Sequence, residues 1–295
     1  MNTIGPAHAA SRIAARRGFR RVTLAGSGTE FLFFVASGHG RQEGYRVPRT
    51  PYFKTANNPG VSASDLQRQE MALAAWARTN GVPSAQPLDL IDQDGYPVLV
   101  LEVLDDDGSR LDSAAVGAVI ATMHLLPPPG LAFVAQNGLP IGVRIAERLG
   151  HRYSALGQRT QLPPLPPVGR MADALESSLA PPGLVHLDVR RQNVRVQQGR
   201  PLSLFDWSNA LPAAPELEIA RIEEYAAIAA KGLDYRAFRE GYAAAGGVVN
   251  ETYAAWPLFR LDAAVMLAVV FDSVAPDPAL RELFLGRVTS LLGQL

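Results

Sequence analysis

The stretch that decides the fold is His186-Leu187-Asp188-Val189-Arg190-Arg191-Gln192-Asn193, followed by Leu204-Phe205-Asp206-Trp207. The first segment has the pattern His-x-Asp-x-x-x-x-Asn, and the second is a short apolar run that ends in an aspartate. Asp206 comes 13 residues after Asn193, and this gap accommodates a hairpin of two strands, 194–197 and 202–205, joined by a turn at 198–201. Such a hairpin would place Asn193 and Asp206 at the same end of the two strands.

This pattern has the layout of a kinase catalytic loop followed by a metal-binding aspartate. Asp188 can accept the proton of a substrate hydroxyl, and Asn193 can reach a magnesium ion from the end of the loop. Asp206 can bridge magnesium to the phosphates of a nucleotide. The motif therefore predicts Asp188 as the catalytic base, and Asn193 and Asp206 as ligands of Mg²⁺.

The two segments resemble the aminoglycoside phosphotransferase family, the small-molecule branch of the kinase-like fold. Members typically have His-Gly-Asp in the loop and Asp-Trp after the hairpin, so Asp206-Trp207 fits this branch better than the Asp-Phe-Gly of protein kinases. Leu187 stands where the family usually has glycine, which indicates a local change of packing. The resemblance covers roughly residues 20–270.

The resemblance implies an α+β, protein-kinase-like fold of two lobes. We expect residues 1–104 to form an N-lobe with a small antiparallel β-sheet, and residues 105–295 to form a mostly helical C-lobe. Two N-lobe strands flank the turn Gly26-Ser27-Gly28-Thr29, where glycine lets backbone N–H groups approach phosphate oxygens. Gly26, Ser27 and Gly28 are accordingly expected to cover the nucleotide phosphates.

A kinase also needs a cation on its third strand, and two residues compete for this role. Lys54 is one of only two lysines in the chain, whereas Arg46 lies in Arg46-Val47-Pro48-Arg49, which resembles the end of this strand in some family members. We favour Lys54, because a lysine kept in an arginine-rich chain suggests a need for a compact ammonium. A helix over 64–79 carries Glu70, and by resemblance this glutamate pairs with the cation.

The next predicted elements lead to a hinge between the lobes. Strands are expected at 88–92 and 97–103, joined by a turn at Asp94-Gly95. The acidic run 105–108 follows as the hinge. By resemblance, adenine contacts the backbone of Leu101 and Val103, on either side of Glu102.

The expected C-lobe begins with a helix over 113–126 that carries His124, which we interpret as a structural residue. Between 127 and 182 the pattern is weak, and the family places its substrate-binding helices in this region. The segment 215–221 resembles the Pro-x-x-Asp-Leu-Ala of the family, with Glu218 in place of the aspartate. We expect Glu218 to make a buried structural hydrogen bond.

Composition limits the classes of partner. The chain of 295 residues is 47% hydrophobic and can bury a substantial core. Its net charge of zero argues against a nucleic-acid partner. It has no cysteine, which excludes disulfides and thiolate metal sites, and we expect a cytoplasmic protein. The apolar segment 258–274 is interrupted by charged residues, so we expect a buried helix and no membrane span. The sequence pattern indicates no particular oligomeric state.

These features together predict a phosphotransferase that uses Mg²⁺ and ATP or GTP to phosphorylate a hydroxyl of a small molecule. A Walker-type Gly-x-x-x-x-Gly-Lys-Ser/Thr motif is absent from the sequence. The alternatives are a metabolic kinase of the choline, homoserine or methylthioribose type, and a non-catalytic nucleotide-binding pseudokinase. A protein kinase is disfavoured, since Asp206 is followed by Trp207 where protein kinases have the Phe-Gly of Asp-Phe-Gly.

The charges beside the base bear on the substrate. Arg190 and Arg191 are expected to contact the acceptor or the γ-phosphate, where they would repel a polycationic aminoglycoside. We therefore expect a hydroxylated substrate that is not a polycation, such as an antibiotic or other natural product modified by a resistance-type kinase. Four later glutamates could offset the arginines if they faced the cleft: Glu216, Glu218, Glu223 and Glu224.

Overall fold

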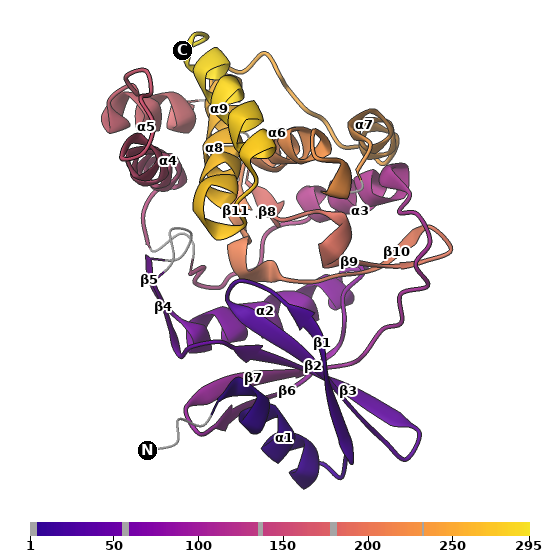
Figure 1. The fold of residues 1–295 in the computed structure, drawn as a ribbon. Coiled ribbons are helices and arrows are strands. Elements are labelled where there is room, and N and C mark those ends of the chain that lie inside the picture. The colour runs from indigo at the N-terminus through magenta and orange to yellow at the C-terminus, as the bar shows by residue number, and fades with distance from the viewer. Residues whose placement is uncertain (1–4, 55–58, 135–137, 178–181, 232) are drawn as a thin grey trace. The chain divides into compact units, whose positions relative to one another are not determined.

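The computed structural model describes residues 5–54, 59–134, 138–177, 182–231 and 233–295. The chain divides into two compact units (Figure 1). The first unit contains Met1–Ser109 and Val194–Ser208, and the second contains Arg110–Asn193 and Asn209–Leu295. The hairpin 194–208 thus belongs to the first unit, although it follows the predicted catalytic loop in the sequence. The lobe boundary expected after residue 104 stays a prediction.

The first unit is built on an antiparallel sheet of five strands in the order β1-β2-β3-β7-β6 (Figure 1). These strands are β1 (Arg21–Ser27), β2 (Phe31–Gly38), β3 (Arg41–Pro48), β6 (Pro87–Gln93) and β7 (Tyr96–Leu101). Two separate ribbons pair β4 (Tyr52–Lys54) with β5 (Pro59–Ser62), and β9 (Val194–Gln197) with β10 (Arg200–Leu204). The helices of this unit are α1 (Pro6–Arg16) and α2 (Ala63–Thr79). The expected α+β fold class is confirmed.

Three hairpins turn through a pair of residues with positive φ. His39 (54°) and Gly40 (73°) join β2 to β3, Asp94 (56°) and Gly95 (80°) join β6 to β7, and Gln198 (52°) and Gly199 (80°) join β9 to β10. Such two-residue turns match the right-handed twist of paired strands. The turn between β9 and β10 is shorter than the turn expected at 198–201. Gly199 takes its positive φ without steric cost, so that pairing begins again at Arg200.

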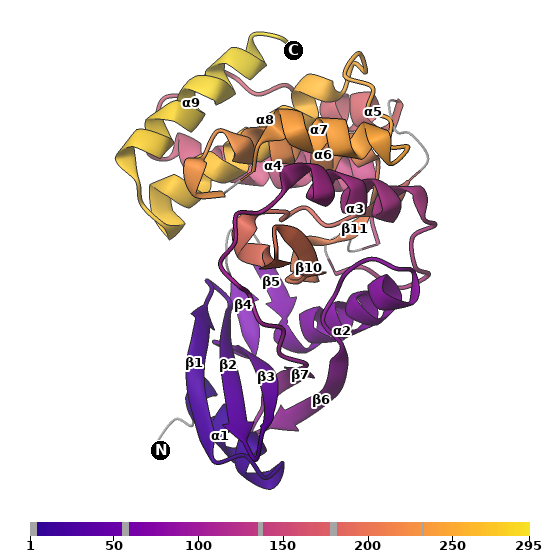
Figure 2. The same cartoon turned by 90° about the vertical axis from the view of Figure 1, so that its right-hand side faces the viewer.

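The two faces of the sheet are covered by different helices. Tyr45 and Val47 of β3 are fully buried and pack in one cluster with Ile13 of α1. Successive side chains of a strand point to opposite faces, so Arg46 faces the other side. There α2 lies beside β6 and β7 (Figure 2), and its Gln67 donates to the backbone oxygen of Arg46 at 2.7 Å. Helix α2 therefore covers the face that carries Arg46.

The second unit is mostly helical (Figure 1). Its helices are α3 (Ser113–Leu125), α4 (Ile141–Gly157), α5 (Val168–Ser177), α6 (Pro215–Ala226), α7 (Tyr235–Ala244), α8 (Trp256–Val269), the π-helix η4 (Val270–Val274) and α9 (Pro278–Leu292). Shorter elements are β8 (Gly183–Val185) paired with β11 (Leu211–Ala213), and the 3₁₀ turns η1 (Arg191–Asn193) and η3 (Ala229–Lys231). Helix α8 is almost wholly buried and packs against α4, α6 and α9, so the core of this unit is centred on it.

Helices α3 and α7 approach each other through two glycines. A Cβ atom on Gly117 of α3 would lie 2.1 Å from the backbone oxygen of Phe238. A Cβ atom on Gly241 of α7 would lie 2.0 Å from the backbone oxygen of Ala114. Real side chains do not tolerate such distances, so both glycines are needed for this close packing. The contact holds the helix that carries His124.

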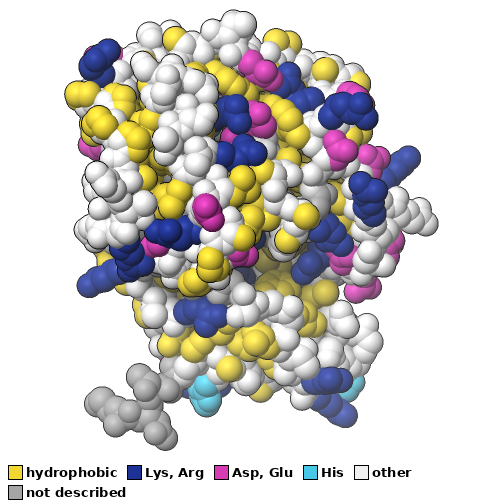
Figure 3. Space-filling view, turned by 45° about the horizontal axis from the view of Figure 1, so that its top comes forward, with side chains coloured by type: hydrophobic (Ala, Val, Ile, Leu, Met, Phe, Trp, Pro, Cys, Tyr) yellow, Lys and Arg dark blue, Asp and Glu magenta, His cyan; other side chains and the backbone are white. Residues whose placement is uncertain are grey.

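The surface is consistent with the balanced charge of the sequence. Basic and acidic side chains are mixed over the face seen in Figure 3. Among the described residues, no helix is both long and apolar enough to cross a membrane. In α8, which lies in the most apolar late segment, Asp262 is fully buried within the second unit.

Candidate active site

Asp188 is held by hydrogen bonds from three side chains of the second unit. Its Oδ1 accepts from Tyr225 Oη at 2.8 Å and from Arg190 Nε at 2.9 Å. Its Oδ2 accepts from Asn193 Nδ2 at 2.6 Å and from Arg190 Nη2 at 3.1 Å. Asp188 is only 7% exposed. These donors fix the orientation of the carboxylate, as required of a base that must meet a hydroxyl proton in one geometry.

The loop before Asp188 turns at Leu187, whose φ is 62°. This left-handed conformation costs a residue with a Cβ atom about 1–2 kcal/mol, and glycine avoids the cost. Both sides of the residue are held by α6. Its N–H donates to Glu218 Oε1 at 2.7 Å, and its carbonyl accepts from Arg221 Nη1 at 3.0 Å. Leu187 is 1% exposed, so burial and these contacts keep a leucine in a conformation that suits glycine.

Three polar residues on one face of α6 contact this loop. Glu218, Arg221 and Tyr225 are spaced three and four residues apart, which places them on one face of the helix, and all three are buried. Glu218 accepts from the backbone N–H of His186 at 3.1 Å and lies 2.8 Å from Nε2 of His124. Burial alone would raise the pKa of Glu218, but its contact with His124 makes the pKa lower than usual. The structural roles expected for Glu218 and His124 are confirmed.

A single buried carboxylate binds three arginines next to the loop. Asp262 of α8 accepts from Arg148 Nη2 and Arg221 Nη2 at 2.7 Å each, and from Arg152 Nη1 at 3.3 Å. Burial would raise the pKa of Asp262, but the three guanidinium groups hold it well below its usual value. Burial, together with the charge of Arg148, lowers the pKa of Arg152 to about 9. The cluster therefore carries more positive than negative charge.

In the first unit, Arg46 is the centre of a second polar cluster. Its Nη2 donates to Asp206 Oδ1 at 2.8 Å and to Ser208 Oγ at 2.7 Å, and its Nη1 donates to Gln67 Oε1 at 2.8 Å. The guanidinium carbon lies 3.4 Å from the ring centroid of Phe31. Arg46 is 6% exposed, so this cation is held in one position by its partners.

Arg46 is also the cation that pairs with Glu70. Arg46 Nη2 lies 3.8 Å from Glu70 Oε2, while Lys54 is exposed on the β4–β5 ribbon outside the five-stranded sheet. Glu70 further accepts from the backbone N–H groups of Asp206 at 2.9 Å and Trp207 at 2.7 Å. The geometry thus supports Arg46 against our preference for Lys54, because Arg46 lies on the sheet face that α2 covers.

The glycine turn is tied to the end of β3. Arg49 donates to the backbone oxygen of Gly28 at 2.9 Å and to Ser27 Oγ at 2.7 Å. Gly26 and Ser27 are the last residues of β1, and Gly28 opens the turn, its N–H donating to the backbone oxygen of Phe31 at 2.9 Å. The predicted phosphate-covering residues therefore lie together in one hairpin, β1–β2.

Leu101, the first of the two residues predicted to contact adenine, is the last residue of β7. Val103, the second, comes two residues later. The side chain of Glu102 is hydrogen-bonded within the first unit, where its Oε1 accepts from Arg78 Nη1 at 3.0 Å. Further along, the carboxylates of Asp106 and Asp107 accept from two backbone N–H groups of the β9–β10 hairpin, at 3.1 Å and 2.7 Å. The acidic run is thus hydrogen-bonded to the β9–β10 hairpin, which precedes Asp206.

Lys231 lies close to Asp188, although no sequence motif marks it. Its Nζ is 5.0 Å from the ring centroid of Tyr225, whose hydroxyl donates to Asp188. Gln192 of the loop donates to a backbone oxygen of η3 at 2.6 Å, which ties Lys231 to the loop. Burial, followed by the charge of Arg190, lowers the pKa of Lys231 to about 8, while Asp188 raises it. The rarity of lysine in this chain is the signal that could have identified it.

Asn193 and Asp206 carry oxygen atoms of the kind that magnesium prefers. The amide nitrogen of Asn193 donates to Asp188, which leaves its side-chain oxygen as the atom that could bind a cation. The side chain of Asp206 is 35% exposed. Within the described part of the chain, no group of three His, Cys, Asp or Glu could hold a metal ion. Carboxylate and amide oxygens suit Mg²⁺ as an ion that keeps several waters, and the assignment of Asn193 and Asp206 as its ligands stays a prediction.

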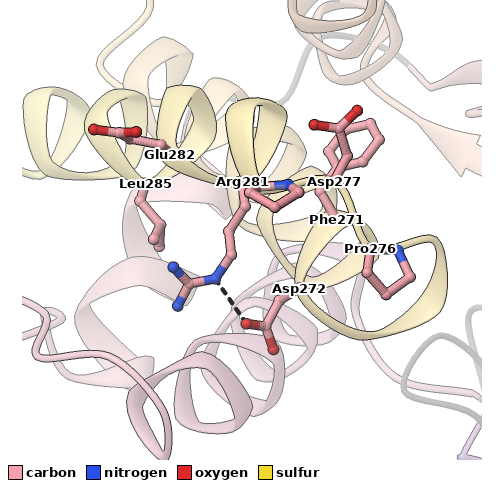
Figure 4. Close-up of a pocket in the computed structure, with 8 residues that line it drawn as sticks. Phe271, Asp272, Pro276, Asp277, Arg281, Glu282 and Leu285 are labelled. Atoms are coloured by element: carbon pink, nitrogen blue, oxygen red, sulfur yellow. Dashed lines mark hydrogen bonds and ion pairs between the residues drawn. The ribbon is translucent and has the colours of Figure 1, made fainter.

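A separate surface hollow of about 630 Å³ lies between η4 and α9 (Figure 4). Arg281 Nε donates to Asp272 Oδ1 at 2.8 Å, and Asp272 also accepts from Arg159 at 2.9 Å. The hydrogen bond from Arg281 is the main cause of a lowered pKa of Asp272. The hollow contains none of the predicted site residues, and its arginine and Asp272 are already paired.

Comparison with known families gives a match over most of the chain. A family model described as the phosphotransferase enzyme family, APH, matches residues 21–259. The chain belongs to this family. The phosphotransferase is therefore an enzyme of the small-molecule kinase type that acts on a hydroxyl group, and its kinase-like fold is confirmed. The search of curated proteins found no match.

Three solved structures illustrate the similarity of fold. A Haemophilus somnus protein assigned as a fructosamine-3-kinase has a TM-score of 0.70 and 12% identity, over 98% of this chain and 97% of that one. Macrolide 2'-phosphotransferase type I has a TM-score of 0.58 and 16% identity, over 98% and 99%. The ADP-bound aminoglycoside phosphotransferase APH(2'')-Ib has a TM-score of 0.62 and 13% identity, over 98% and 97%.

Proposed function

We propose that the phosphotransferase transfers the terminal phosphoryl group of ATP or GTP to a hydroxyl of a small molecule. In this proposal Asp188 accepts the hydroxyl proton, Asn193 and Asp206 bind Mg²⁺, and Arg46 binds the nucleotide phosphates with Glu70 as its partner. Magnesium would neutralise the charge that develops on the phosphates. The observation that carries the proposal is the fixed, buried carboxylate of Asp188 and its hydrogen bond from Asn193.

The rest of the nucleotide site follows from the same proposal. The β1–β2 hairpin with Gly26, Ser27 and Gly28 covers the phosphates, and the backbone of Leu101 and Val103 contacts the base. Two relatives support a nucleotide donor, since APH(2'')-Ib was solved with ADP and a variant of APH(4)-Ia with AMP-PNP and hygromycin B.

The acceptor is a hydroxylated small molecule that carries at most one positive charge, in the first place an antibiotic or another natural product. Arg190 contacts Asp188 directly, and Arg191 follows it in η1. Two like charges about 6 Å apart repel by about 3 kcal/mol at an effective dielectric constant of about 20. A polycationic aminoglycoside would meet this repulsion at the base, whereas a neutral acceptor would not.

The test is a screen of hydroxylated antibiotics and metabolites, choline, homoserine and methylthioribose among them, with ADP or GDP release as the readout. Asp188→Asn keeps the shape of the base and removes its charge. We expect turnover to fall by ~10² or more while nucleotide binding is retained. Asp173→Asn is the control, because Asp173 is an exposed aspartate of α5 in the same unit.

If Asp188→Asn kept near wild-type turnover, Asp188 would not be the catalytic base. A protein that binds the nucleotide with Mg²⁺ but phosphorylates no acceptor would instead be a pseudokinase. Efficient phosphorylation of a tricationic aminoglycoside would contradict the expected substrate charge.

A further inference from the structure

Positive charge is in excess around Asp188 within the second unit. Arg190 pairs with Asp188 at 2.9 Å, and Lys231 lies near enough for both charges to act on its pKa. Behind the loop, three arginines share the single carboxylate of Asp262. These two groups contain five cations and two carboxylates, so positive charge is in excess among them.

Three of the four glutamates of α6 have partners of their own within the second unit. Glu224 accepts from Arg260 and Arg287 at 2.8 Å each, and Glu223 lies 3.3 Å from Arg260. Glu218 is committed to the loop backbone and to His124. Glu223 and Glu224 are therefore paired with arginines, and the contacts of Glu218 are made with the loop backbone and His124, so none of the three binds Lys231 or Arg190.

Lys231 is placed like a binding group beside the base. Its ammonium lies over the ring of Tyr225, and its segment η3 is tied to the loop through Gln192. A partly buried ammonium next to Arg190 is unfavourable, and its lowered pKa reflects this cost, which Asp188 offsets only in part. A lysine needed only for packing could be replaced by an apolar side chain, which would avoid the cost.

We propose that Lys231, together with Arg190, binds an anionic group of the acceptor, so that the hydroxyl substrate carries a carboxylate or a phosphate. This inference rests on the proposed function, because it takes Asp188 as the base that the acceptor hydroxyl must reach. The substrate class is then a hydroxy acid or a phosphorylated polyol, and the two cations orient its hydroxyl toward Asp188 while they bind its charged end.

The first experiment compares acceptors that share one six-carbon polyol chain and differ at one end. The set is glucitol (neutral), gluconate (carboxylate), glucitol 1-phosphate (phosphate) and glucamine (ammonium), the last three altered at C1. With Mg²⁺ and saturating ATP, kcat/KM is expected to be about tenfold or more higher for an anionic member than for glucitol, and lowest for glucamine. The carboxylate and phosphate members show which anion is preferred.

Affinity provides a second measurement that needs no turnover. Calorimetric titration of the protein with AMP-PNP and Mg²⁺ should show the same order, with an anionic polyol bound more tightly than glucitol. Equal or weaker binding of both anions, or no binding of either, would overturn the inference.

Lys231→Met keeps most of the length of the side chain and removes its charge. The ratio of kcat/KM for the anionic acceptor to that for glucitol should fall about tenfold, mainly through KM, and Lys231→Arg should restore it. Arg236→Met is the matched control, because this side chain of α7 is 89% exposed in the same unit, and it should leave the ratio unchanged. A loss that is equal for all acceptors would mean a structural role and would overturn the inference.

The outcomes separate the inference from the function on which it rests. Failure of the proposed function would appear as a lack of Asp188-dependent phosphorylation of every acceptor, whether or not the nucleotide binds. Asp188-dependent turnover that favours neutral or cationic acceptors would overturn only the inference.

Discussion

The guanidinium of Arg46 donates to the carboxylate of Asp206 at 2.8 Å, and both residues contact Glu70 of α2. Arg46 comes from the middle of the sheet and Asp206 from the end of the β9–β10 hairpin, 160 residues later in the chain. The proposed phosphate-binding cation and one proposed magnesium ligand are therefore paired within the first unit. Binding of a nucleotide with Mg²⁺ is expected to exchange this ion pair for contacts to phosphate and metal.

Replacing Arg46 should affect activity far more than replacing Lys54. Arg46→Met is expected to lower kcat/KM for the nucleotide by ~10² or more, as for loss of a donor to a developing charge. Lys54→Met should change it by less than about threefold, because Lys54 is exposed on a separate ribbon. Arg46→Lys should give an intermediate kcat/KM, since lysine keeps the charge but lacks the planar guanidinium that binds three partners. Steady-state kinetics measures this order, and thermal unfolding checks that each variant is folded.

The conformation of Leu187 predicts an unusual order of stability for two substitutions. Leu187→Ala removes buried contacts and keeps a Cβ atom at a φ of 62°, so we expect a loss of about 2–5 kcal/mol. Leu187→Gly loses the same contacts but is relieved of about 1–2 kcal/mol of backbone strain. Glycine should therefore destabilise less than alanine, which is the reverse of their order in helices. Urea unfolding of both variants decides this, and a less stable glycine variant would argue against the left-handed loop.

Stability should decline in acid because two buried carboxylates have lowered pKa values. Burial opposes ionisation of Glu218 and Asp262, but the contact with His124 and the three arginines lower their pKa values below the ordinary 4.5 and 3.8. A group whose pKa is lower in the folded state stabilises the fold above its unfolded pKa. This stability is lost as the pH falls from about 4.5 through the lower folded-state values.

Urea unfolding across that range measures the decline. Glu218→Gln should lower stability at neutral pH, because it replaces a charged acceptor of the loop backbone, and should make the acid decline less steep. Glu240→Gln serves as the control, because the side chain of Glu240 is 69% exposed. An unchanged acid profile in Glu218→Gln would contradict a folded-state role for that carboxylate.

The activity with an anionic acceptor should depend on the protonation of Lys231. Burial and the charge of Arg190 lower its pKa to about 8, Asp188 opposes this, and the ring of Tyr225 lies beneath the ammonium. The ammonium is charged below this pKa, so kcat/KM for gluconate relative to glucitol should fall as the pH rises through about 8. Lys231→Arg should move the fall to higher pH, because a guanidinium stays protonated. A ratio that does not change with pH would mean that Lys231 does not meet the anion.

Local features were predictable because neighbouring residues decide them. The helix expected over 64–79 is observed as Ala63–Thr79, and the turn at Asp94-Gly95 joins the two strands that were expected around it. Both depend on periodicity and on residues that accept positive φ. The turn at 198–201 was wrong by two residues, since the pattern did not show that Gln198 would share the positive φ of Gly199.

The sequence by itself determined which chemistry the chain can perform. The spacing of Asp188, Asn193 and Asp206 predicts a kinase-type loop, because that chemistry uses a base and metal ligands that are close together along the chain. Only the tertiary structure decided which partners these groups have. Arg46 and not Lys54 meets Glu70, and Tyr225 and Lys231 stand beside Asp188, because sheet register and helix packing bring together residues that lie far apart in the sequence.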